Sequence, residues 1–111
     1  MFLGRVTGHV VATQKDRSLG GQKLLVVEPL SVKYDEASKS KPASLANTGR
    51  AIVALDVVGA GEGQLVLVVQ GSSARMTEQT KELPADAVIV GIVDSATYAG
   101  KTFHDARLSR D

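Results

Sequence analysis

The sequence contains no cysteine and no tryptophan, and aromatic residues make up only 4% of its 111 residues. The absence of cysteine excludes disulfide bonds and thiolate metal sites. The scarcity of aromatic side chains argues against single-stranded nucleic-acid and sugar sites, because such sites usually stack their ligands on aromatic faces. The chain also lacks an excess of either charge, with 13 basic and 12 acidic residues. A nucleic-acid-binding protein usually carries a basic excess or stripe, so the charge balance does not favour that function either.

Long apolar runs are absent as well. None approaches the roughly 18 residues needed to span a bilayer, and polar Thr7 and His9 interrupt the N-terminal segment before a signal-peptide core could form. We therefore expect a soluble, intracellular protein with no membrane partner. The length fits one domain with one modest core, and 43% hydrophobic with 23% charged residues is an ordinary globular balance.

Five segments rich in valine, isoleucine and leucine are predicted to be β-strands, since glycine, proline or polar clusters bound them. They are residues 6–13, 23–28, 51–58, 65–69 and 88–93, the second ending at Pro29. A short helix is predicted from Ser72 to about Gln79, with Ser72 or Ser73 as its N-cap. These elements predict a mainly β fold: a small closed five-stranded OB-like β-barrel with one short helix.

The predicted barrel domain occupies residues 1–95. Within it, residues 31–49 are polar and rich in lysine, serine and alanine, which is typical of a long surface loop or a hairpin tip. Residues 96–111 are predicted to be a C-terminal tail that docks on another surface.

The second, fourth and fifth predicted strands are apolar on both faces, because hydrophobic and polar residues do not alternate along them. In a small antiparallel barrel one strand face fills the interior and the other meets water. An apolar outer face needs a cover that one short helix cannot supply. The pattern therefore predicts a homo-oligomer in which another copy of the chain provides the cover.

A glycine-rich segment after the third strand imitates a dinucleotide-binding loop. Gly59 and Gly61 have the required spacing, but the third glycine of the motif would fall at Gln64, whereas the sequence has Gly63. A pyrophosphate site also needs a helix directly after the glycines, and here a short β-branched run follows. We therefore interpret the segment as a tight connection between two strands, in which glycines permit positive φ and close approach of another backbone.

The segment from Gly71 to Arg75 contains two serines that could hold an anion at a helix start, assisted by Arg75. The alternative is a helix cap followed by an arginine at a subunit interface. No Walker lysine pattern surrounds the segment, and we favour the cap and interface reading.

Pairs of carboxylates are conceivable at Asp86 with Asp94 and at Asp56 with Glu62. Surface and turn roles are commoner for such residues, and Asp86 follows a proline and precedes a strand, as turn residues often do.

The two histidines, His9 and His104, lie near opposite ends of the chain without the local ligand spacing of a metal site. No serine has the context of a nucleophile elbow. We therefore expect no catalytic residues, no cofactor and no bound metal, and the chain is predicted not to be an enzyme.

Several segments in series resemble the bacterial microcompartment vertex proteins of the EutN/CcmL family. They occur in the family's order and cover most of the chain up to Ser95, namely residues 8–15, 23–27, 56–61, 65–68, 71–75, 84–87 and 90–94. Each motif alone is weak, and the series is specific. The departures lie in residues 31–49, which are longer and more polar than usual, and in the tail.

The resemblance implies an OB-like barrel that assembles as a homopentamer and caps the vertices of a polyhedral shell. Its other partners would be the hexameric shell proteins that tile the facets, and its location the microcompartment shell in the bacterial cytoplasm. A cyclic ring closes through one repeated heterologous interface, which would cover the apolar strand faces. The residues expected at the subunit interface or the central pore are Gly59, Ala60, Gly61, Ser72, Ser73 and Arg75.

Two other hypotheses remain. A small OB-type binding module for nucleic acid or another polyanion would rely on Lys33, Lys39 and Lys41 as its basic groove. A more distant reading is a fragment of a nucleotide-binding enzyme.

Overall fold

The computed structural model describes residues 1–12, 21–37, 41–71 and 86–107. Within these ranges the backbone forms the following strands: β1 (Phe2–Val10), β2 (Lys23–Lys33), β3 (Ser44–Asn47), β4 (Ile52–Asp56), β5 (Leu65–Gln70), β6 (Ala87–Ile92), β7 (Ser95–Tyr98) and β8 (Lys101–Asp105). The described residues include no helix long and apolar enough to cross a membrane. The helix predicted from Ser72 to about Gln79 lies outside the described residues.

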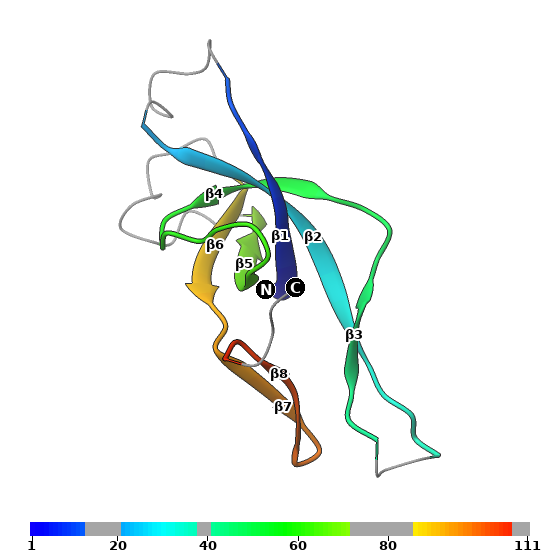
Figure 1. Ribbon diagram of the computed structural model, residues 1–111. Helices are drawn as coiled ribbons and strands as arrows, with labels where there is room; N and C mark the ends of the chain where they lie inside the picture. Colours follow the sequence, from blue (N-terminus) through cyan, green and yellow to red (C-terminus); the bar gives the residue numbers. More distant parts are fainter. Residues whose placement is uncertain (13–20, 38–40, 72–85, 108–111) are drawn as a thin grey trace.

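Five strands close into a barrel in the order β1-β5-β6-β4-β2, because β2 also pairs with β1 (Figure 1). All neighbours are antiparallel except β4 and β6, which are parallel. Counted along the chain, the first barrel strand is followed around the barrel by the second, third, fifth and fourth. This is the Greek-key order of an OB-fold. The prediction of a mainly β, closed five-stranded OB-like barrel is therefore confirmed.

The barrel interior is filled by side chains that alternate along the strands. Val66 and Val68 of β5, Val27 of β2 and Ile89 of β6 have no exposed surface and belong to one buried cluster. Gly4 of β1 lies where a Cβ would overlap Val27, so a larger residue there would push β1 away from β2. Close packing of branched side chains thus fixes the barrel, since interiors tolerate little added volume.

Strand β2 is longer than predicted, because it runs through Pro29 instead of ending there. The pairing of β2 with β4 ends at Val27, and its pairing with β3 begins at Leu30. Pro29 therefore lies in a gap on that side of the ladder, where its missing N–H breaks no pairing with β3 or β4. The Thr48 hydroxyl donates to the Pro29 carbonyl at 2.9 Å.

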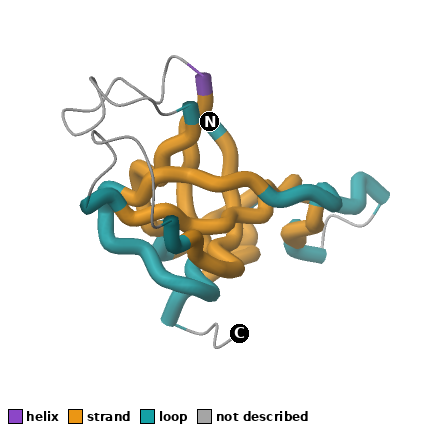
Figure 2. Tube along the Cα trace, turned by 90° about the horizontal axis from the view of Figure 1, so that it is seen from above, coloured by secondary structure: helices purple, strands orange, loops and turns teal. Residues whose placement is uncertain are grey.

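Two hairpins extend beyond the barrel. The end of β2 pairs with β3, so residues 31–49, which were predicted to be a surface loop or hairpin tip, include a two-stranded ribbon. This ribbon reaches away to one side of the barrel (Figure 2). The second hairpin pairs β7 with β8, within and next to the segment predicted to be a tail.

The β7–β8 hairpin turns at Ala99 and Gly100, whose φ angles are 53° and 79°. Two positive φ values match the tight turns that suit the right-handed twist of paired strands. Next to this turn, the ring of Tyr98 contacts that of Tyr34, with centroids 4.9 Å apart in an edge-on arrangement. Tyr34 directly follows β2, so the tyrosine pair joins the two hairpins at their tips.

Candidate functional site

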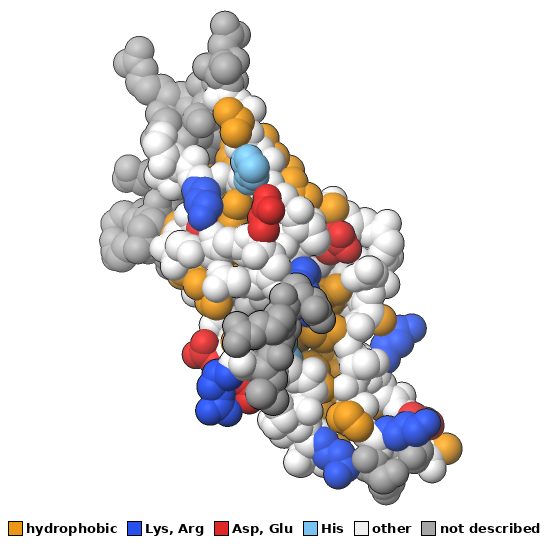
Figure 3. All heavy atoms as spheres, viewed as in Figure 1, with side chains coloured by type: hydrophobic (Ala, Val, Ile, Leu, Met, Phe, Trp, Pro, Cys, Tyr) orange, Lys and Arg blue, Asp and Glu red, His pale blue; other side chains and the backbone are white. Residues whose placement is uncertain are grey.

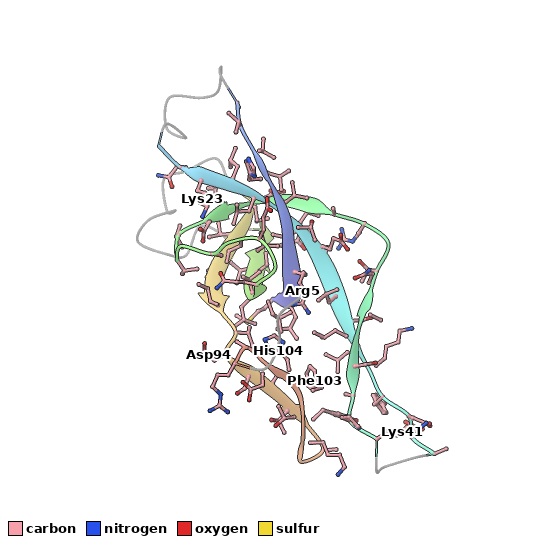
Figure 4. The ribbon with its side chains drawn as sticks, viewed as in Figure 1. Arg5, Lys23, Lys41, Asp94, Phe103 and His104 are labelled. Atoms are coloured by element: carbon pink, nitrogen blue, oxygen red, sulfur yellow. The ribbon has the colours of Figure 1, made fainter. Side chains whose placement is uncertain are left out.

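The glycine loop, residues 57–64, connects β4 to β5 and begins at a buried carboxylate. The Asp56 side chain is 1% exposed, and its Oδ2 lies 3.7 Å from the Lys23 ammonium nitrogen. The backbone N–H groups of Val58 and Ala60 donate to its two oxygens at 3.0 and 2.8 Å. Lys23 also donates to the Ala60 carbonyl (Figure 4 labels Lys23 beside the loop). One carboxylate and one ammonium group thus hold the first half of the loop.

The second half of the glycine loop is fastened to β1. The Gly63 N–H donates to the Val6 carbonyl at 2.7 Å, and the Val6 N–H donates to the Gln64 carbonyl at 3.0 Å. The side-chain oxygen of Gln64 accepts a hydrogen bond from the Gly61 N–H at 2.8 Å. Gly59 and Gly63 have φ values of 82° and 89°, the left-handed region that glycine enters without strain.

This geometry supports the reading of the loop as a connection between strands. The amides of Ala60, Gly61 and Gly63 donate to acceptors within the protein, and strand β5 follows the glycines where a dinucleotide site needs a helix.

The six candidate interface residues do not share one environment in the structure. Gly59 is exposed and Gly61 is half-buried. Ala60 has 0% exposure and belongs to the barrel core, so its methyl group already packs within its own subunit. The remaining three candidates, Ser72, Ser73 and Arg75, lie outside the described residues.

The acidic and histidine candidates have contacts of their own. Glu62 lies with one oxygen 3.1 Å from Nδ1 of the exposed His9, whereas the Asp56 carboxylate binds loop amides and Lys23. Asp86 and Asp94 are exposed, and their backbone carbonyls accept hydrogen bonds from the N–H groups of Gly71 and Ala106, next to the β5–β6 and β7–β8 pairings. Among the described residues there is no group of three or more potential metal ligands.

A cleft of about 600 Å³ lies between the two hairpins, and sequence reasoning missed it. Arg5 of β1, segment 43–45 beside and within β3, and residues 102–105 of β8 line it. Figure 3 shows hydrophobic side chains between the hairpins, and Figure 4 shows Arg5, Phe103 and His104 close to this space. The cleft could not be predicted because β3, β7 and β8 are short and carry no apolar run.

His104 lies at the inner end of the cleft and is only 9% exposed. Its Nε2 is fully buried and has no hydrogen-bond partner among the described residues. Beside it, Asp105 accepts hydrogen bonds from the side chain and the backbone N–H of Arg107, at 2.9 to 3.2 Å. These bonds favour the charged carboxylate and hold the pKa of Asp105 below its ordinary value.

Apolar residues lie on the outer face of β2, β5 and β6, as the sequence predicted, and also on that of β4, which it did not predict. Leu55, Val69 and Val88 form a second buried cluster, and each is adjacent in its strand to a residue of the barrel core. On the same outer face, Val53 of β4 stays 50% exposed. The fold thus defines a small OB-like barrel protein with apolar residues on part of its outer face.

Comparisons with known proteins agree with this class. A family model described as ethanolamine utilisation protein EutN/carboxysome matches residues 1–94. The bacterial microcompartment shell vertex protein PduN of Salmonella typhimurium is 48% identical over 95 residues, which cover 86% of this chain and 97% of the relative.

Solved structures give the same result. CcmL from Gloeobacter violaceus superposes with a TM-score of 0.79 at 34% identity, covering 96% of this chain and 99% of that one. The pentameric microcompartment shell protein GrpN from Rhodospirillum rubrum superposes with a TM-score of 0.67 at 42% identity, covering 88% of this chain and all of its own. The chain belongs to the EutN/CcmL family.

Proposed function

We propose that this chain is a structural shell protein that forms homopentamers and caps the vertices of a bacterial microcompartment in the bacterial cytoplasm. The observation that carries the proposal is the family match over residues 1–94, together with a relative of known pentameric structure that aligns over its whole length. The same match favours this function over a nucleic-acid-binding OB module, for which the sequence offers neither a basic excess nor many aromatic residues.

Geometry explains why such a protein is needed. A flat layer of hexagonal units cannot close on itself, and pentagonal units supply the curvature that turns it into a polyhedron. A ring of five identical subunits repeats one heterologous contact until it closes. We infer that hexameric shell proteins surround each pentamer and are its second class of partner.

The proposed role is mechanical and involves no catalysis or cofactor. Support comes from the way in which the most suggestive groups are already engaged. The Asp56 carboxylate binds two loop amides and lies beside Lys23, and Glu62 faces His9 at the surface. These contacts shape the glycine loop and occupy both of these carboxylates, so that neither is free for acid–base chemistry.

We further propose that Gly59, Ala60 and Gly61 lie at or beside the subunit interface or the central pore, with Ser72, Ser73 and Arg75. Gly59 and Gly61 carry no side chain and would let a neighbouring backbone approach closely. Ala60 would contribute indirectly, because its buried methyl group anchors the segment to the core.

Co-assembly with a hexameric shell protein tests the vertex role. Expressed alone, the hexamer should form open sheets or tubes, whereas co-expression with this chain should give closed polyhedral particles in electron micrographs. Equal closure without this chain, or particles that exclude it, would overturn the proposed function.

A further inference from the structure

The tips of the two hairpins flank a second hollow, at the end of the molecule away from the barrel (Figure 1). Its volume is about 610 Å³, which is the size of a site for a small organic ligand. We call it the tip hollow. Its lining joins the segment that follows β2 to the turn between β7 and β8, and includes Tyr34, Asp35, Glu36, Tyr98 and Ala99.

Both tyrosines of the chain line the tip hollow. Their ring planes meet at 68° with centroids 4.9 Å apart, so the rings touch edge-on and do not cover each other by stacking. Tyr34 is 54% exposed and Tyr98 is half-buried. The open face of an aromatic ring attracts a cation, because the π-electrons give that face a partial negative charge.

Negative charge predominates in the lining. Asp35 and Glu36 supply two carboxylates against one ammonium group, that of Lys41, which Figure 4 labels at this end of the ribbon. The Tyr34 hydroxyl donates to Glu36 Oε1 at 3.3 Å. Burial, Tyr34 and Glu36 together raise the pKa of Tyr98, so the Glu36 carboxylate lies near both rings. A cation would find opposite charge beside aromatic surface here, whereas an anion would be repelled.

We propose that the tip hollow binds an arginine side chain presented by a peptide segment of a partner protein. A guanidinium group is planar, stacks on aromatic faces and donates two parallel N–H bonds to one carboxylate. A lysine ammonium group has no plane to stack. The hollow is also larger than a lone guanidinium group requires, and Ala43 and Ala99 offer apolar surface to the side-chain stem and the adjoining peptide.

The tip hollow is complete within one subunit, since all of its lining comes from one chain. It would therefore attach a further protein to each subunit without using the barrel. This role is additional to vertex capping, and binding does not depend on the number of subunits.

Tyrosine fluorescence reports on the tip hollow alone, because the chain has two tyrosines and no tryptophan. Titration with a capped Gly-Arg-Gly tripeptide should change this fluorescence saturably. The matched citrulline peptide keeps the shape but lacks the charge, and should bind about fivefold more weakly or worse. Equal affinity for the two peptides, or no saturable change with the arginine peptide, overturns the inference.

Methylguanidinium ion separates a peptide ligand from a free small cation. It should bind more weakly than the arginine peptide, because it lacks the stem and the backbone. If it binds as tightly as the peptide, the hollow is a site for free cations and the proposed partner is wrong.

A substitution within the hollow locates the binding by calorimetric titration of the arginine peptide. Glu36→Gln removes one carboxylate but keeps an oxygen that accepts from the Tyr34 hydroxyl, and should weaken binding about two- to fivefold. Glu62→Gln removes an exposed carboxylate of the glycine loop and is the matched control, which should bind as wild type does. Tyr98→Leu keeps an apolar side chain but removes one ring, and should abolish most of the binding.

Unchanged binding in both Glu36→Gln and Tyr98→Leu would place the peptide elsewhere and refute the site. A chain that binds the arginine peptide as expected but does not form pentamers would refute the proposed function and leave this inference intact.

Discussion

At the scale of single residues, Asp56 fixes the conformation of the glycine loop, a role that its place in the sequence does not indicate. It was a candidate for a carboxylate pair, but it ends β4 and its two oxygens receive the amides of Val58 and Ala60. A carboxylate with almost no exposed surface is costly unless such donors and a cation compensate for lost water. Here the compensation fixes the start of the glycine loop.

Asp56→Asn tests this role. The substitution keeps the shape but turns one oxygen into an NH₂ group, which would face a backbone N–H instead of accepting from it. Leaving a buried donor unsatisfied costs about 1–3 kcal/mol, so the free energy of unfolding in urea should fall by that amount. Glu62→Gln, at an exposed site, is the control and should change little. Equal stability of Asp56→Asn and wild type would refute the anchoring role.

Substitutions at Gly61 and Gly59 distinguish the loss of a subunit contact from strain in the backbone of the subunit itself. A Cβ at Gly61 would come no closer than 4.0 Å to the Gln64 oxygen, and its φ is not in the left-handed region. Gly61→Val should therefore leave the subunit folded while weakening the ring, if this glycine meets a neighbour. Gly59→Val should destabilise the subunit itself by about 1–3 kcal/mol, because φ is 82° there.

Thermal unfolding and native mass spectrometry of the two variants distinguish these effects. If Gly61→Val forms rings as well as wild type does, Gly61 is not at a tight subunit contact.

At the scale of elements, the two hairpins contact each other at their tips through Tyr34 and Tyr98. The tyrosines meet edge-on beyond the cleft, a geometry that aromatic rings favour. Burial and, after it, the neighbouring Tyr34 raise the pKa of the Tyr98 hydroxyl above its ordinary value. A raised pKa means that the folded protein prefers the neutral phenol, so this contact stabilises the fold up to about pH 10 and weakens as pH rises further.

The tyrosine pair can be titrated directly, because the chain has only two tyrosines and no tryptophan. Followed by the NMR signals of its ring, Tyr98 should titrate above its ordinary pKa of 10.0 in wild type. In Tyr34→Phe the pKa should move down toward that value, since the neighbour's influence is lost. An unchanged titration of Tyr98 in Tyr34→Phe would show that the rings do not interact in solution.

The contrast between the barrel and the two hairpins also shows how much of the fold can be predicted from the sequence alone. The five barrel strands could be predicted because each is an apolar run between turn residues, although their ends shifted, as at Pro29. The shorter β3 and β7 could not, since Ser44 and Ser95 begin four-residue strands whose partners, not their composition, make them strands. The cleft was missed for the same reason.

The candidate site was predictable in part. The strand after Gly63 excluded a cofactor loop from the sequence alone, but the hydrogen bonds of Asp56 with Ala60 were not visible in it. They join residues that become neighbours only once the loop folds back. Likewise, nothing in the sequence indicated that Ala60 would be fully buried while Gly59 stays exposed.

At the scale of the whole molecule, closure of the barrel pairs most strand edges. Among the described residues, the two hairpins leave one edge of β3 and one of β8 unpaired. Edges left open on a monomer invite aggregation. In a ring that closes through one repeated heterologous contact, association stops at a fixed number of copies. The family match over residues 1–94 places this chain among proteins that include a pentameric shell protein.

The central claim is that five copies of this chain form one closed ring, and native mass spectrometry at micromolar concentration tests it most directly. The account predicts a dominant species of five chains, each of 11.6 kDa, that persists on tenfold dilution. A spectrum dominated by monomers or dimers would contradict it.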